Sequence, residues 1–204
     1  MSGNPAASVA QLSASDPSAT VWVNANAGSG KTHVITQRIA RLISQGYPPR
    51  AIVAVTFTNK ASEEMAERVA QKAGEHAAKE LWISTFHALG AEIVRQEARF
   101  VAGGSKFVVY DAVDATGVVK ELLRDLKVHD RKFDPGAIMA RISHAKNALT
   151  TPDEQDDESE YDEIARLCFP RYVAAMKRLN ALDFDDLILV PYRLLEEVPE
   201  VRAR

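Results

Sequence analysis

Several features that would point to a secreted or membrane protein are scarce or missing in this chain of 204 residues. Its one cysteine, Cys168, allows no disulfide within the chain and no cage of thiolates around a metal ion. No apolar run approaches the roughly eighteen residues that a membrane-spanning helix needs. The first basic residue is Lys31, which is too late for the charged start of a secretory signal. We therefore expect a soluble, cytoplasmic protein that has no membrane partner.

Basic charge is also in short supply, because the formal net charge is −3. Much of the acidic excess comes from one run, Thr151 to Glu163, which is rich in Asp and Glu and contains no Lys or Arg. Without this run the rest of the chain is net basic, so the charge does not exclude a nucleic-acid partner. We interpret the run as a solvated loop between helices. The hydrophobic fraction of 46% is ordinary for a protein with a packed core.

The first half of the chain has the pattern of alternating strands and helices. The predicted strands are Thr20–Asn24, Ala51–Phe57 and Leu81–Thr85. The first is expected to be buried, and the second to be covered on both faces because it is almost entirely apolar. Apolar residues at helical spacing follow each strand, with Thr58 or Asn59 as the cap of the second helix. This order predicts a parallel sheet with crossover helices.

After about Arg99 the pattern becomes mainly helical. Lys106–Tyr110 is predicted to be one more extended segment. Helices are predicted around Val118–Leu126, from Asp134 onward, and over Tyr161–Asn180. Asp134 followed by Pro135 is a strong start signal, whereas Pro170 is expected to kink or divide the last helix.

One octet matches the phosphate loop of nucleotide-binding proteins. It consists of Ala25, Asn26, Ala27, Gly28, Ser29, Gly30, Lys31 and Thr32, with Ala25 in place of the usual first glycine. Small residues let backbone N–H groups converge on a phosphate at the amino end of a helix, whose dipole favours anions. Lys31 is predicted to reach the β- and γ-phosphates of ATP, and the Thr32 hydroxyl to ligate Mg²⁺. The alternative is a glycine turn without a ligand.

Together with the octet, three further strings resemble superfamily 1 DNA helicases of the UvrD/Rep/AddA type. They are VAVTFTNKASEEMAER (Val53–Arg68), ISTFHALG (Ile83–Gly90) and LDFDDLI (Leu182–Ile188). The string from Gln11 to Leu42 looks most like AddA, and the later strings look more like Rep and UvrD. The resemblance implies an α/β fold, a RecA-like P-loop NTPase with a parallel sheet and an inserted all-helical subdomain, incomplete at the C-terminus.

The implied activity is that of an ATP-dependent helicase, which translocates 3′ to 5′ on single-stranded DNA in DNA repair, recombination or replication. The partners it implies are ATP and single-stranded DNA or duplex junctions. The resemblance divides the chain into a flexible amino-terminal segment with a glutamine motif, the first part of an ATP-binding motor domain, a helical insertion and a return toward the motor domain. These parts cover residues 1–18, 19–99, 100–182 and 183–204.

The resemblance also assigns individual residues. Gln11 is implied to read the adenine edge, and its alternative is an exposed tail glutamine. Phe57 is implied to stack on a DNA base, while Thr58, Asn59 and Lys60 donate to phosphates. In the next string, Thr85 and His87 are implied to contact the DNA backbone with Phe86 beside them. Without the resemblance, Phe57 and Phe86 are expected to be core residues and His87 an ordinary residue of a helix start.

The acidic residues bring two further expectations. Asp183, Asp185 and Asp186 could suggest a metal site, but we favour an acidic helix start because no other ligand cluster supports a metal. Phosphoryl transfer in such motors also needs an acidic pair and arginines from a second motor domain. In the resembled family the acidic pair follows the LDFDDLI string, and this sequence reaches Arg204 without one. We therefore expect an amino-terminal fragment that binds nucleotide and hydrolyses it poorly.

Two other classes of protein fit part of the pattern. A P-loop phosphotransferase would use the octet, but it would leave the strings around Phe57 and Phe86 without a role. A non-catalytic module that binds ATP or DNA and regulates an unknown protein partner would need no acidic pair. Binding of single-stranded DNA separates the first alternative from a helicase, and ATP turnover stimulated by DNA excludes the second.

Overall fold

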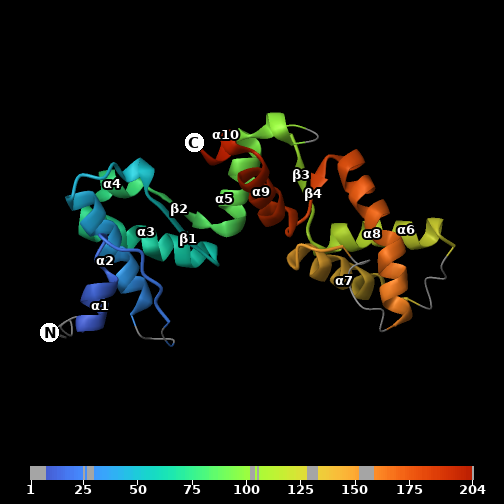
Figure 1. Ribbon diagram of the computed structural model, residues 1–204, viewed down its shortest axis with the longest axis horizontal. Coiled ribbons are helices and arrows are strands. Elements are labelled where there is room, and N and C mark those ends of the chain that lie inside the picture. The colour runs from blue at the N-terminus through green and yellow to red at the C-terminus, as the bar shows by residue number, and fades with distance from the viewer. Residues whose placement is uncertain are drawn as a thin grey trace. The chain divides into compact units, whose positions relative to one another are not determined.

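The computed structural model of the chain contains helices and short parallel strands (Figure 1). It describes residues 8–24, 26, 30–101, 104, 106–127, 133–151 and 159–203. The chain forms two compact units, Met1–Phe86 and His87–Arg204. Within the described ranges, no helix is both long enough and apolar enough to cross a membrane.

The first unit is built around a pair of parallel strands, β1 (Val53–Thr56) and β2 (Trp82–Thr85). Helix α2 (Lys31–Ser44) precedes them, and α3 (Asn59–Ala73) and α4 (Glu75–Glu80) connect them. Helix α3 packs against both strands and against α2. The core of this unit consists of Ile39, Ala54, Met65, Val69 and Leu81. The strands predicted at Ala51–Phe57 and Leu81–Thr85 are therefore confirmed as β1 and β2. The helices predicted after the three strand segments are confirmed too, as α2, α3 and the helix that begins at Phe86. Helix α4 was not predicted.

The predicted strand at Thr20–Asn24 is wrong. These residues adopt no regular secondary structure, and the Trp22 side chain is 95% exposed. A strand needs a neighbour that pairs with its backbone N–H and C=O groups. In the first unit β1 and β2 pair with each other, and neither of them pairs with this segment. Its β-branched and aromatic composition is therefore not enough to make it a strand.

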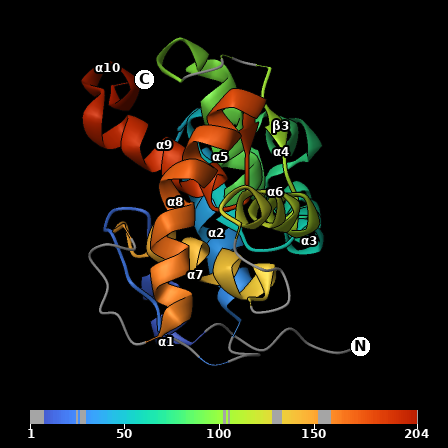
Figure 2. The same ribbon diagram turned by 90° about the vertical axis from the view of Figure 1, so that its right-hand side faces the viewer.

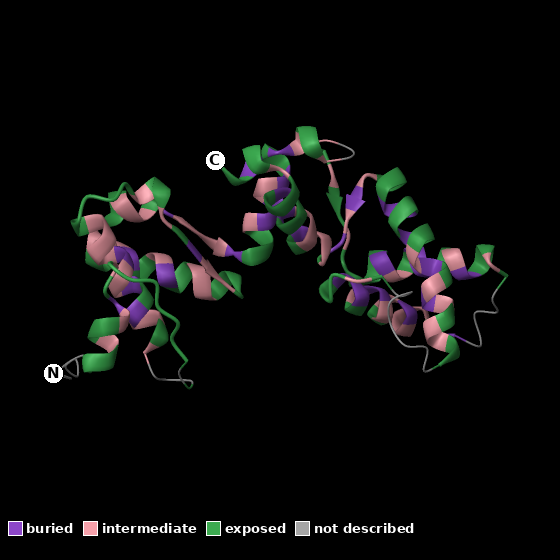
Figure 3. Cartoon of the chain, in the orientation of Figure 1, coloured by how far each residue is buried: buried purple, intermediate pink, exposed green. Residues whose placement is uncertain are grey.

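Strand β1 is also less covered than its apolar sequence predicts. Ala54 is buried at 7% exposure, but Val53 on the opposite face is 53% exposed. Helix α3 packs on β1 and belongs to the same core as Ala54. The prediction that both faces are covered is therefore wrong at Val53. Figure 3 shows how buried, intermediate and exposed residues are distributed along the chain.

The described part of the amino-terminal segment contains a helix, α1 (Val9–Ala14). Ser8 and Gln11 close its first turn through reciprocal hydrogen bonds. At its other end, Arg41 of α2 donates to the Leu12 carbonyl over 3.2 Å, and Arg38 donates to the carbonyls of Ala14 and Asp16. The last carbonyls of a helix have no partner within the helix, so guanidinium donors stabilise them well. Residues 8–18 are therefore held on α2 where the sequence predicted flexibility.

The described part of the second unit consists of helices and two short strands. They are α5 (Phe86–Gln96, whose first residue belongs to the first unit), the 3₁₀ helix η2 (Ala98–Phe100), β3 (Val108–Val109), α6 (Ala112–Asp125), α7 (Pro135–Asn147), α8 (Glu160–Leu179), β4 (Ala181–Leu182), α9 (Asp186–Glu197) and α10 (Pro199–Arg202). Helices α6, α7 and α8 pack against one another (Figures 1 and 2). Strand β3 pairs in parallel with β4, so the extended segment predicted near Val108 is confirmed.

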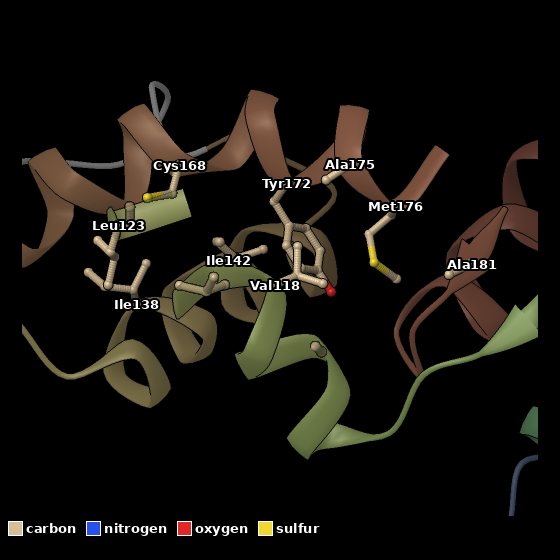
Figure 4. Close-up of a cluster of buried hydrophobic side chains, with 12 residues drawn as sticks. Val118, Leu123, Ile138, Ile142, Cys168, Tyr172, Ala175, Met176 and Ala181 are labelled. Atoms are coloured by element: carbon tan, nitrogen blue, oxygen red, sulfur yellow. The ribbon is translucent and has the colours of Figure 1, made fainter. Parts of the chain in front are cut away.

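Local sequence signals account for these helices. Asp134 caps α7, as predicted, by accepting from the N–H groups of Gly136 and Ala137, each over 3.2 Å. Helix α8 runs through Pro170 without a break, so the expectation that this proline divides the helix is wrong. The inner faces of the three helices form one core around Leu123, Ile142 and Tyr172 (Figure 4). This core holds α8 together where its own backbone hydrogen bonding is interrupted.

A glycine allows α5 and α9 to approach closely. A Cβ atom built on Gly90 of α5 would lie 1.8 Å from the carbonyl oxygen of Leu187 in α9. We expect Gly90→Ala to lower the free energy of unfolding by about 1–3 kcal/mol, because the two helices must separate. In α6 a Cβ on Gly117 would meet no atom within 4 Å. There Gly117→Ala should raise stability by about 0.5–1 kcal/mol through helix propensity. Urea denaturation measures both, and an unchanged midpoint for Gly90→Ala would contradict this packing.

Candidate functional site

The amino end of α2 carries the described part of the predicted phosphate loop. Gly30 caps the helix with a φ of 85°, a left-handed conformation that glycine adopts without strain. Lys31 and Thr32 follow as the first helical residues, and the first turn contains no acidic residue that would neutralise the helix dipole. The Lys31 ammonium donates to the Asn26 carbonyl over 2.8 Å, so its side chain reaches back to Asn26. Predicted site residues Ala25, Ala27, Gly28 and Ser29 lie outside the described residues.

Gln11 lies beside this helix start. A Cβ built on Gly30 would come within 2.9 Å of Gln11 Nε2, so the missing side chain at position 30 makes room for the amide. Gln11 Oε1 accepts a hydrogen bond from the Ser8 backbone N–H over 2.9 Å. The alternative of an exposed tail glutamine is therefore wrong, because Gln11 is partly buried and caps α1 next to Gly30. Its contact with adenine stays a prediction.

Two aromatic rings stand together at the carboxyl ends of β1 and β2. The parallel register pairs Thr56 with Thr85, so the next residues, Phe57 and Phe86, lie side by side. Their ring centroids are 5.6 Å apart, with 47° between the ring planes. Phe57 is 86% exposed and Phe86 is 42% exposed. The expectation that they are core residues is therefore wrong, and the pair presents apolar faces on the surface of the first unit.

The predicted polar contacts near this pair differ in their exposure. Thr58 caps α3, where its hydroxyl accepts from the Ala61 N–H over 3.2 Å. Asn59 and Lys60 are exposed in the first turn of α3, which contains no acidic residue. Thr85 is buried at 8% exposure, so its side chain is covered where the prediction needs it to reach DNA. The structure therefore leaves Asn59 and Lys60 accessible beside the aromatic pair.

His87 begins the second unit and has an aromatic neighbour that the sequence did not suggest. Its ring lies edge-on to the Phe184 ring, with 5.5 Å between the centroids. Both residues are exposed, Phe184 by 50%. Phe184 belongs to the LDFDDLI string and was not among the predicted DNA contacts. A spacing of about a hundred residues hides this contact from any local sequence pattern.

The acidic residues of that string form a buried ionic cluster with α7 and α8. Lys146 Nζ lies 2.6 Å from Asp183 Oδ2 and 2.8 Å from Asp186 Oδ1. The Tyr172 hydroxyl donates to Asp183 over 2.8 Å. Lys146, Asp183 and Tyr172 are each at most 5% exposed. The predicted acidic helix start is confirmed, since α9 begins at Asp186, but the role of Lys146 as the counter-ion was not predicted.

Burial and charge shape the ionisation of this cluster. Burial opposes the charge of Asp183, but the Lys146 ammonium and the hydrogen bonds from the Asp186 N–H and the Tyr172 hydroxyl together lower the pKa of Asp183 below its usual value. Burial raises the pKa of Asp186, and the neighbouring Asp183 charge adds to this effect, although Lys146 opposes both. Burial, followed by the charge of Asp183, raises the pKa of Tyr172, which therefore stays a hydrogen-bond donor. One ammonium thus holds two carboxylates that would otherwise repel each other.

A cavity of about 320 Å³ lies in the second unit between the end of α8 and α9. Its walls are mainly apolar and include Phe107, Met176 and Leu189, with Lys146 and Asp186 at one side. The residues that line it are not those predicted to bind ATP or DNA, which lie at the helix start of α2 and at the strand ends.

Comparison with known proteins identifies the family. The UvrD/REP helicase N-terminal domain family matches residues 7–204 of the chain. The chain therefore belongs to the UvrD/REP helicase N-terminal domain family. This membership agrees with the resemblance of the four strings and removes the support for a phosphotransferase.

Individual relatives are similar over most of the chain. ATP-dependent DNA helicase Rep of Salmonella typhimurium is 46% identical over 185 residues, which are 89% of this chain and 27% of the relative. Rep of Escherichia coli is 45% identical over the same length and shares of both chains. ATP-dependent DNA helicase PcrA of Staphylococcus aureus is 39% identical over 182 residues, 88% of this chain and 25% of the relative. The chain thus spans about a quarter of the length of the curated relatives that it matches.

Proposed function

We propose that the first unit of this chain carries ATP and single-stranded DNA contacts of an ATP-dependent DNA helicase that moves 3′ to 5′. The observation that carries this proposal is the exposed pair of Phe57 and Phe86 at the ends of two parallel strands, in a chain of this family. Exposed aromatic faces are costly in water unless they meet a partner, and nucleic-acid bases are flat partners of the right kind.

The nucleotide half of the proposal rests on the start of α2. An open helix dipole, a glycine cap with positive φ and a lysine at the first helical position suit the phosphates of ATP. The Lys31 ammonium would exchange its bond with the Asn26 carbonyl for the β- and γ-phosphates. The Thr32 hydroxyl, one residue further along, is the group that would ligate Mg²⁺. We also propose that β1 and β2 are part of the parallel sheet of a RecA-like P-loop fold.

The DNA half assigns roles around the aromatic pair. Bases would stack on Phe57 and Phe86, while Lys60 and the open amino end of α3 would face phosphates. His87 and Phe184 in the second unit form another aromatic surface, and we include both as contacts with single-stranded DNA. The helicase cycle itself, with arginines and an acidic pair for phosphoryl transfer, belongs to the whole protein.

Binding of a labelled single-stranded oligonucleotide, followed by fluorescence anisotropy, tests the DNA half. We expect binding that weakens steeply as salt rises, because each phosphate contact contributes a slope of about 0.7 in a plot of log affinity against log salt concentration. The same titration with a labelled oligosaccharide of similar size is the control for non-specific binding of the probe. Absent or salt-independent binding of the oligonucleotide would contradict the proposed function.

A further inference from the structure

We propose that Lys146 is a positioning residue for DNA binding, an inference that rests on the proposed function. Lys146 bridges Asp183 and Asp186, the two carboxylates on either side of Phe184 along the chain. By holding both, it keeps the half-exposed Phe184 ring beside His87 and open to a DNA base. Lys146 itself is 5% exposed, so it acts through the turn that it holds and touches no DNA.

The backbone around Phe184 is closed into a compact turn. The Asp186 N–H donates to Asp183 Oδ1 over 2.9 Å, and the Asp183 N–H donates to Asp186 Oδ2 over 3.3 Å. Each carboxylate therefore accepts from the backbone of the other residue with one oxygen and from Lys146 with its second oxygen. Without the ammonium, two like charges would face each other in a buried turn, and their repulsion would open it.

The turn is also fastened to two helices of the bundle. Tyr172 of α8 donates to Asp183, and Asn147 of α7 donates to Asp185 over 3.0 Å. The Phe184 ring itself lies edge-on to His87, and half of its surface is exposed. The backbone conformation decides which rotamers a side chain can adopt, so the position of the Phe184 ring depends on the turn that the carboxylates close.

A purely structural role for the cluster is the competing explanation. Buried ion pairs often contribute little net stability relative to apolar residues of similar volume, and orientation is one property that they can supply instead. The two explanations differ in a measurable way. A structural role changes the stability of the whole unit, whereas a positioning role changes the Phe184 ring and the DNA affinity of the folded protein.

The experiment compares the chain with its Lys146→Met variant, after circular dichroism has shown that both are folded. The chain's seven phenylalanines are replaced by 4-fluorophenylalanine, and the ¹⁹F resonance of position 184 is assigned from Phe184→Leu. We expect Lys146→Met to shift or broaden this resonance and to leave those of Phe57 and Phe86 in the other unit unchanged. If Lys146→Met does not fold, Lys146→Gln replaces it with the same expectation, because it also leaves the two carboxylates without an ammonium.

Affinity for a labelled single-stranded oligonucleotide supplies the second measurement. The Lys146 variant should bind about 2- to 30-fold more weakly, the range for residues that act through another group. Phe184→Ala should add little to this loss, because both changes remove the same contact. A Lys146 variant that keeps both the resonance and the affinity of the parent chain overturns the inference. Phe57→Ala distinguishes failure of this inference from failure of the proposed function. If Phe57→Ala also leaves the affinity for the oligonucleotide unchanged, the proposed function is wrong.

Discussion

Lys31→Ala is expected to abolish measurable binding of ATP to this chain, with an affinity at least about 100-fold lower than that of the parent. Removal of the ammonium leaves the triphosphate facing the start of α2 without the one side-chain cation that the described helix start offers. The helix dipole and backbone N–H groups alone are weaker and are easily screened by salt. Isothermal titration calorimetry with Mg·ATP measures the effect.

The matched control is Lys79→Ala, which removes an exposed lysine from the last turn of α4 in the same unit. Its ATP affinity should equal that of the parent, because general loss of positive charge contributes little at physiological ionic strength. Unchanged ATP affinity of Lys31→Ala would contradict the assignment of the octet as a phosphate loop.

The double change Phe57→Ala and Phe86→Ala should produce the second large effect, a loss of affinity for single-stranded DNA. A base stacked on an aromatic ring contributes about 1–3 kcal/mol, which corresponds to about 5- to 150-fold for each ring. Because the two rings are 5.6 Å apart and can share one base, the double variant should lose less than the sum of both. Anisotropy of a labelled oligonucleotide at fixed salt measures the loss.

Tyr47→Ala is the control for this experiment, because Tyr47 is also an exposed aromatic residue of the first unit, with 55% of its surface exposed. The salt dependence gives a further check. The double alanine variant should keep the slope of the parent, since no phosphate contact is removed. Equal affinity of the double variant and the parent would show that the exposed pair serves another partner.

Local chemistry made much of the fold predictable. The start of α7 at Asp134 and Pro135, the cap at Thr58 and the buried face of α3 all depend on residues a few positions apart. The segment Thr20–Asn24 has the composition of a strand, yet a strand also needs a neighbour to pair with, and composition does not reveal one. The amino-terminal helix was missed although Ser8 and Gln11 form a local capping box, and its anchors Arg38 and Arg41 are more than twenty residues away.

The residues of the candidate site were likewise predicted only in part. The octet could be identified from spacing alone, and its Lys31 and Thr32 lie at the start of α2 as predicted. Phe57 and Phe86 were assigned by resemblance, while their mutual contact follows from a parallel register that the sequence does not display. Lys146 was missed entirely, because a lysine within a helix usually faces water, and its carboxylate partners lie 37 and 40 residues further along.

Hydrogen-exchange mass spectrometry of the chain, alone and with each ligand, tests whether the first unit carries both sites. A nonhydrolysable ATP analogue with Mg²⁺ should slow exchange in peptides that cover residues 25–34. A single-stranded oligonucleotide should slow exchange in peptides that cover residues 56–60 and 85–88. If both ligands leave these peptides unchanged, or protect only other parts of the chain, the nucleotide and DNA sites do not lie where we propose.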